Sequence, residues 1–210
     1  VVAIFMFFFL FKDNLFGTGI KQIPKNLEPT YSSFLSCVDQ ITLHGASILG
    51  SQGGYIYAPE FEAGSRFMPF SSQLDFFGNP IPYWYYVSGN NLQKEQVPTK
   101  KMMGEQLSQF VDENLADCNF DSFRSQGISV EIGEPKTTST IGDKEILVET
   151  KMRMVLKFEN ESIILSDHVV SVKSKVGKLY ASAKKIYDYE QSSLFLENYA
   201  VDVLRSYAPV

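Results

Sequence analysis

The sequence holds few of the residues that active sites and metal sites use most often. Among its 210 residues there are two histidines and two cysteines. These four side chains are only as many ligands as one structural zinc site uses, so they leave little material for a metal centre or for histidine-based catalysis. Basic residues are also outnumbered, with 19 Lys and Arg against 24 Asp and Glu and a net charge of −5. Because phosphate backbones are bound by basic surfaces, we predict no nucleic-acid partner.

Catalytic and cofactor motifs are missing as well. The patterns G-x-S-x-G and H-E-x-x-H do not occur in the chain. The glycine-rich residues 50–54 follow a predicted helix, whereas a phosphate-binding loop precedes a helix and carries a lysine. His44 and His168 lie within predicted elements without a nucleophile motif beside them, and we interpret both as structural. We therefore predict that the protein is not an enzyme and holds no cofactor or metal.

Apolar residues are plentiful and unevenly placed. Hydrophobic residues make up 44% of the chain and aromatic residues 14%, which is enough for one sizeable core and excludes a disordered chain. The first stretch, VVAIFMFFFLF, contains no polar side chain. As a helix it would extend about 16 Å, roughly half of a bilayer's hydrocarbon core. We interpret it as the outer part of a transmembrane helix whose beginning is missing; a buried strand or core helix and a signal-peptide segment are the alternatives.

This interpretation divides the chain into three parts. Residues 1–14 are predicted to anchor the protein in membrane lipid. Residues 15–29 contain two glycines and two prolines, which interrupt a helix and favour a short tether. Residues 30–210 are predicted to form an extracytoplasmic α+β domain on the cell surface.

Four helices are predicted in the large domain, because apolar residues recur there every three to four positions. The first begins at Thr30, whose side chain is expected to cap it, and ends before the glycines at residues 50–54. The second covers residues 99–117. Two more are predicted around residues 179–186 and 196–204.

Between the second and third predicted helices the period changes to two. Alternation of apolar and polar residues predicts strands at residues 128–132, 146–158 and 163–172, with a hairpin turn at residues 159–161. One face of such strands is apolar and the other polar, as antiparallel sheets allow. We therefore predict an α+β fold in which helices pack on an antiparallel sheet of about three or more strands.

Residues 55–97, called the aromatic segment below, show no sustained period and mix prolines with large aromatic side chains. Flexible linkers contain few large aromatics, so we expect an irregular but ordered excursion with short strands at residues 55–57 and 83–87. Tyr and Trp are common at interfaces because they combine apolar area with a hydrogen-bonding group. Four of them are candidate interface residues: Tyr83, Trp84, Tyr85 and Tyr86. A carbohydrate groove and a second core under an ordered loop are the alternatives.

The two cysteines fall in related positions. Cys37 lies in the first predicted helix, and Cys118 follows the second, on the same helical face as Leu115. A disulfide between them would close a loop of about 80 residues and contribute about 4–5 kcal/mol in the chain-entropy model. We predict this disulfide, which fits an oxidising compartment outside the membrane. Two buried thiols that never meet are the alternative.

One glycosylation motif occurs in the chain, at Asn160-Glu161-Ser162. It falls on the predicted hairpin turn, where a side chain is exposed, and we expect Asn160 to be glycosylated.

Several short motifs resemble those of a family of uncharacterised archaeal surface proteins from small-genome, often host-dependent lineages. The resemblance rests on these residues: Cys37, residues 49–60 (LGSQGGYIYAPE), residues 83–86 (YWYY), Cys118 and residues 133–135 (GEP). It covers about residues 1–190 and implies a single-pass, N-terminally anchored protein with an external α+β region. Because that family carries no established activity, the resemblance implies no catalytic residues.

The leading hypothesis is a membrane-anchored cell-surface protein with a structural or interaction role, such as a subunit of a self-assembling envelope structure or of a pilin-like filament. Its expected partners are membrane lipid, through the N-terminal segment, and a protein partner or further copies of itself. Two alternatives stay open. One is an extracytoplasmic glycan-binding module or hydrolase that uses the aromatic residues at 55–86, and the other is an accessory subunit of a membrane complex.

Overall fold

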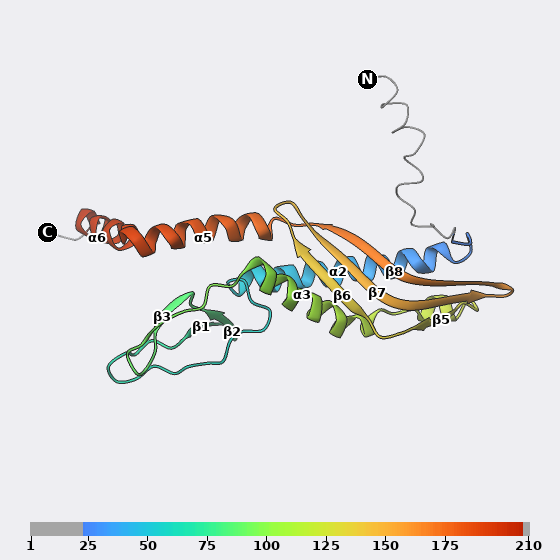
Figure 1. Cartoon of the computed structure of the whole chain (residues 1–210), viewed down its shortest axis with the longest axis horizontal. Helices are drawn as coiled ribbons and strands as arrows, with labels where there is room; N and C mark the ends of the chain where they lie inside the picture. The colour runs from blue at the N-terminus through green and yellow to red at the C-terminus, as the bar shows by residue number, and fades with distance from the viewer. Residues whose placement is uncertain (1–22, 208–210) are drawn as a thin grey trace, which may run out of the picture.

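Figure 1 shows the computed structural model of the chain, which describes residues 23–207. The predicted membrane anchor at residues 1–14 and the first part of the predicted tether lie outside the described residues. The described elements follow in this order: α2 (Glu28–Ser51), β1 (Gln73–Phe76), β2 (Asn79–Pro82), β3 (Tyr85–Val87), β4 (Gln93–Glu95), α3 (Lys100–Asn114), the 3₁₀ turn η1 (Leu115–Asp117), α4 (Asp121–Arg124), β5 (Ser129–Ile132), β6 (Lys136–Ile141), β7 (Glu145–Phe158), β8 (Glu161–Lys173), α5 (Val176–Ser193) and α6 (Phe195–Tyr207).

The main sheet is antiparallel and is built around β7. Strand β8 pairs along one edge of β7. On the other edge, β6 pairs with residues 146–151 and β5 with residues 154–157. The predicted α+β class and antiparallel sheet are confirmed. Strand β6 was not predicted, because its inward positions carry the hydroxyl residues Thr137 and Ser139, which leave no apolar alternation.

Two helices cover one face of this sheet (Figure 1). α2 packs against β8, α3 packs against β6, and the two helices contact each other. The core between these layers contains fully buried side chains from both helices and from β7, among them Phe34, Leu107, Ile146 and Leu156. Removal of this apolar surface from water is the main favourable contribution to folding.

Two glycines and one polar side chain let α3 approach its neighbours closely. A Cβ at Gly45 of α2 would lie 2.5 Å from Leu107 Cδ1, and a Cβ at Gly104 of α3 would lie 2.5 Å from the carbonyl oxygen of Ser139. Ser108 Oγ accepts a hydrogen bond from the Ser139 amide at 2.8 Å. α3 thereby covers the edge of β6 that is left unpaired by the strands within residues 23–207, which protects it from pairing with another chain.

The C-terminal helices extend beyond the main sheet and the helices α2 and α3 that cover it, which together we call the body. α5 begins close to the β6–β7 turn, where a Cβ at Gly177 would lie 2.2 Å from the Gly142 carbonyl oxygen. From there α5 and α6 extend away from the sheet (Figure 1). Leu194, with φ of 49°, separates the two helices, and α6 contains no buried residue. Both helices were predicted, although they are longer than the apolar pattern indicated.

Two local predictions are wrong. α2 begins at Glu28, so Thr30 lies in its first turn and not at its cap. Pro29 favours this earlier start, because proline suits the first turn of a helix, and Leu27 before it is fully buried. Residues 55–57 form no strand, because the amides of Ile56 and Tyr57 donate to the side chain of Gln106.

Among residues 23–207, no helix combines the length and apolar character needed to cross a membrane.

Candidate interaction surface

The aromatic segment is fastened to the helices at its start. Gly53 and Gly54 end the turn after α2 with φ of 65° and 97°, values that glycine adopts without strain. Gln106 Oε1 on α3 then accepts the amides of Ile56 and Tyr57 at 2.7 and 3.1 Å. The segment is therefore an ordered part of the fold, as predicted.

Two short hairpins follow within the segment. β1 pairs with β2 and β3 pairs with β4, both antiparallel. The Ser72 carbonyl accepts the Tyr83 amide at 3.1 Å, and the Trp84 carbonyl accepts the Gln96 amide at 2.8 Å. The strand predicted at residues 83–87 is present as β3, whereas the other three strands were not predicted.

The four candidate interface residues divide into an inner and an outer pair. Trp84 Nε1 donates to the Gly53 carbonyl at 2.8 Å. Its ring centroid lies 5.9 Å from that of Tyr180 and 5.6 Å from that of Tyr187, both on α5. Tyr86 is buried, whereas Tyr83 and Tyr85 are partly exposed. Trp84 and Tyr86 are therefore packing residues, and only the outer pair is available for a contact.

A buried tyrosine and an ion pair join distant parts of the segment. Tyr86 Oη donates to Glu62 Oε1 at 2.9 Å, and Lys94 Nζ forms an ion pair with the same oxygen. The hydrogen bond from Lys94 lowers the pKa of Glu62, while burial and then the bond to Glu62 raise the pKa of Tyr86. Glu62 is thus an ionised carboxylate whose charge is balanced by Lys94, and such a group is a poor general base.

A second tyrosine links the segment to α5. Tyr187 Oη donates to Glu95 Oε1 at 2.9 Å, and burial followed by this bond raises the Tyr187 pKa to about 12. Tyr180 Oη donates to the Pro98 carbonyl at 2.6 Å. α5 and the aromatic segment therefore hold each other in place near the body.

The aromatic segment carries five exposed phenylalanines, which we call together the aromatic patch: Phe61, Phe67, Phe70, Phe76 and Phe77. Among them, the rings of Phe76 and Phe77 contact each other, with centroids 4.7 Å apart. Phe67 is 87% exposed and Phe77 is 91% exposed. Phe77 has φ of 52°, an unfavourable value for a bulky residue, and Gly78 follows it with φ of 83°. Large apolar side chains that gain little from the monomer's own packing are typical of interaction sites.

The cavity beside Trp84 does not have the composition of a catalytic or carbohydrate site. It has a volume of about 150 Å³ and is lined mainly by apolar residues, including Leu49, Met103, Leu179 and Tyr180. No Asp, Glu or His lines it. Polar groups that converge on a ligand are expected in such sites. Within residues 23–207, no group of three or more His, Cys, Asp and Glu is placed to hold a metal ion.

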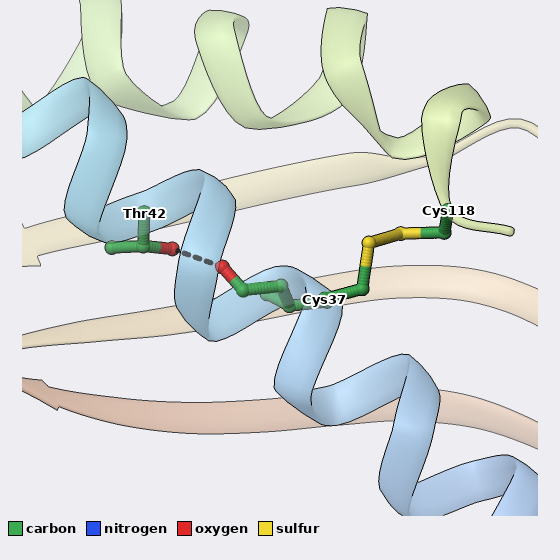
Figure 2. Close-up of a disulfide and its surroundings, with 4 residues drawn as sticks. Cys37, Thr42 and Cys118 are labelled. Carbon is green, nitrogen blue, oxygen red and sulfur yellow. Dashed lines mark hydrogen bonds between the residues drawn. A yellow bond between two sulfur atoms is a disulfide. The ribbon is translucent and has the colours of Figure 1, made fainter.

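Figure 2 shows the disulfide that the sequence predicted. The sulfurs of Cys37 and Cys118 are 2.04 Å apart and the two Cα atoms 6.0 Å apart. The bond joins α2 to the residue that follows η1, and the aromatic segment and α3 lie in the loop that it closes. In the unfolded chain this link restricts an 81-residue separation, so it stabilises the arrangement of both.

The glycosylation motif lies on the predicted hairpin turn. β7 ends at Phe158 and β8 begins at Glu161, and the side chain of Asn160 between them is exposed. Asn26 Nδ2, just before α2, donates to Glu161 Oε2 at 3.3 Å. Asn160 therefore lies near the start of α2, at the opposite end of the molecule from the aromatic segment (Figure 1).

The two histidines occupy different environments. His44 is exposed on α2, with its ring centroid 5.7 Å from that of Phe110. His168 is buried, and its Nε2 lies 2.9 Å from the Met152 carbonyl oxygen, beside a β-bulge in β7. The Phe34 ring packs edge-on against it at 4.9 Å. Burial lowers the pKa of His168, so it stays neutral. Its Nδ1 lies 3.3 Å from Tyr31 Oη on α2, so the ring is a structural hydrogen-bonding group between sheet and helix.

Comparisons of the chain with protein-family models, with curated proteins and with solved structures find no match.

Proposed function

We propose that the protein is a non-enzymatic, membrane-anchored cell-surface protein that assembles with further copies of itself through the aromatic patch. The single observation that carries the proposal is the exposure of five phenylalanines on a segment that hydrogen bonds and a disulfide hold in place. A flexible loop would present such rings at a large entropic cost, whereas this scaffold presents them already ordered.

The position of the patch supports an outward contact. α2 has 24 residues and separates the start of the described chain from the aromatic segment (Figure 1). A helix of that length extends about 36 Å. If residues 1–14 lie in lipid, the aromatic segment lies at the far end of α2 from the residues that lead to the bilayer, where neighbouring molecules can reach it. The disulfide and the exposed Asn160 both suit an extracytoplasmic location, with the glycan near the anchored end.

The glycan-binding alternative receives less support. A tryptophan ring is well suited to stack on a sugar, but Trp84 is engaged by Tyr180 and Tyr187.

The resemblance to archaeal surface proteins agrees with the proposal in topology.

The proposal is tested with the full chain reconstituted in liposomes. We expect ordered arrays or filaments in electron micrographs, and their loss in the variant Phe67→Ser/Phe70→Ser. The matched control is Leu147→Ser/Val169→Ser, which removes two exposed apolar side chains from the open face of the sheet. Deletion of residues 1–14 should release the protein from membranes during alkaline extraction. Isolated particles at high surface density, or arrays unchanged in the patch variant, would overturn the proposal.

A further inference from the structure

Strand β8 forms one edge of the main sheet, and its backbone is less protected there than that of β6 at the opposite edge. Among the strands of residues 23–207, β8 pairs with β7 alone. In β6, the outward amides of Thr137 and Ser139 donate to side chains of α3. Within residues 23–207, no such side chain accepts the outward amides of residues 167–173 in β8. An unpaired strand edge of this kind is a template for pairing with another strand.

The hydrogen-bond pattern shows which backbone groups of β8 point outward. The Ser174 amide donates to the Lys144 carbonyl at 3.1 Å, so these two opposite residues form a hydrogen-bonded pair. Such pairs alternate along an antiparallel ladder, and the next pair, Glu145 with Lys173, is of the other type. Every second residue of β8 therefore directs its amide and carbonyl away from β7: Asp167, Val169, Ser171 and Lys173. All four side chains are exposed, on the face of the sheet that α2 and α3 leave open.

The charges along this edge are self-complementary. Lys173 lies opposite Glu145 of β7, and Asp167 lies opposite Lys151. Neither Lys173 nor Asp167 takes part in an ion pair within residues 23–207. If two β8 edges run antiparallel with residue 170 opposite its own copy, Lys173 of each copy lies opposite Asp167 of the other. Charges then alternate in sign across four strands, and opposite charges directly across an antiparallel pair stabilise it.

We infer that residues 167–173 of β8 pair antiparallel with the same residues of a second copy, which joins two main sheets into one. The register sets the outward backbone groups against each other, residue 167 against 173 and residue 169 against 171. This arrangement gives about eight backbone hydrogen bonds and an ion pair at each end. Any other register separates Lys173 from Asp167, so the charges select this one.

The projecting helices α5 and α6 do not occupy this edge. α5 follows β8, but a Cβ at its Gly177 would lie 2.2 Å from the carbonyl oxygen of Gly142 in the β6–β7 turn. Because β7 lies between β8 and β6, α5 leaves the sheet on the side away from the free edge. A two-fold axis normal to the joined sheet keeps both copies of α2 on one face, antiparallel to each other.

This contact is separate from the aromatic patch, so it can hold or fail independently of the proposed function. α2 leads from the start of the described chain toward the aromatic segment (Figure 1), so an antiparallel pair has its two aromatic segments at opposite ends. A two-fold contact in the middle and a patch at each end is what an extended assembly of identical chains needs. The patch variant Phe67→Ser/Phe70→Ser should stay dimeric in mild detergent. So should Val169→Ser, because it keeps the backbone groups that pair.

The first test reverses single charges and measures the mass of the full chain in mild detergent. We expect the wild type to form dimers. Asp167→Lys and Lys173→Glu should each raise the dissociation constant about tenfold or more, because like charges then face each other. Mixed in equal amounts, the two variant chains should pair with each other about as tightly as the wild type does, because opposite charges face each other again. Damage within one chain would not be repaired by mixing.

Lys136→Glu is the control for this test. Lys136 is exposed on β6, away from the free edge of β8, so its reversal should leave the dissociation constant unchanged. A monomeric wild-type chain would overturn the inference. So would a mixture of the two variants that stays monomeric, or an equal effect of the control.

The second test reads the register with single cysteines. Both native cysteines are in the disulfide, so an added thiol reacts alone. In the inferred register, Val169 lies opposite Ser171 of the second copy. Under mild oxidation, chains with Val169→Cys and chains with Ser171→Cys should form a disulfide together faster than either variant does by itself. Equal rates, or no cross-link in the mixture, would contradict the register and with it the inference.

Discussion

The body of the molecule and its projecting helices differ in how much of their apolar side-chain surface is buried. In the body, α2 and α3 bury one face against the sheet, and side chains such as Phe34 and Leu107 have no exposed area. In α6 no side chain is buried. The body is therefore stable through its own packing, whereas α6 and the aromatic patch have apolar surface that residues 23–207 leave uncovered. The difference separates the part whose stability comes from its own packing from the part whose stability we expect to depend on a partner.

Removal of the disulfide should have the largest effect on the body. We expect Cys37→Ala/Cys118→Ala to lower the free energy of unfolding by about 4–5 kcal/mol, because the unfolded chain loses an 81-residue restriction. Urea unfolding monitored by circular dichroism measures this. Ser36→Ala, an exposed neighbour on α2, serves as the control and should change little. An unchanged midpoint in the double variant would show that the body does not rely on the link.

A methyl group at the contact between α3 and β6 should have the next largest effect. Gly104→Ala would place a Cβ 2.5 Å from a backbone oxygen, and we expect a loss of about 1–3 kcal/mol. The matched variant is Gly50→Ala in α2, where no atom lies within 4 Å of the added Cβ. That substitution should stabilise by up to about 1 kcal/mol, since alanine favours helix more than glycine does. Equal effects would contradict the close packing of α3.

The stability of the body should also depend on pH through His168. Burial lowers its pKa in the folded state below the usual value near 6.5, so protons bind preferentially to the unfolded chain as the pH falls. We expect the free energy of unfolding to be highest above pH 6.5 and to decrease from there down to pH 5. His168→Gln should remove this slope, while His44→Gln should retain it. The same slope in both variants would show that another group is responsible.

The smallest predicted effect has the opposite sign and lies in the aromatic patch. Phe77 and Gly78 both have positive φ, as the central residues of a type I′ turn do, and asparagine is preferred at the first of them. We expect Phe77→Asn to stabilise the β1–β2 hairpin by about 0.5–1 kcal/mol, measured by hydrogen exchange, while weakening assembly. A destabilised hairpin would indicate that the Phe77 ring contributes to the fold of a single chain.

The sequence predicted the body well where the apolar pattern is local. The periods of three to four and of two located α2, α3, β7 and β8, and the turn at Asn160 follows from the polar residues between two alternating strands. The joining of Cys37 and Cys118 was predictable because both follow the apolar faces of helices that pack together. β6 was missed because Thr137 bonds to Thr150 Oγ1 at 2.9 Å, a hydroxyl contact that leaves no apolar signal.

The candidate site was predicted less well, because its details depend on contacts between distant parts of the chain. Nothing near Trp84 in the sequence indicates that its ring lies against Tyr180 and Tyr187, roughly a hundred positions later. The phenylalanines of the aromatic patch were visible as a composition, but the exposure of Phe77 follows from the turn between β1 and β2, where this bulky residue has positive φ. Turn preferences rarely predict such residues.

Amide hydrogen exchange of the full chain, measured at two protein concentrations, tests the difference between body and projecting helices most directly. We predict that α2, α3 and β7 exchange only through global unfolding at both concentrations. α6 should exchange rapidly in dilute solution and become protected when the concentration rises. If α6 is as protected as α2 in the dilute monomer, or unprotected at every concentration, the account of a complete body with partner-dependent helices is contradicted.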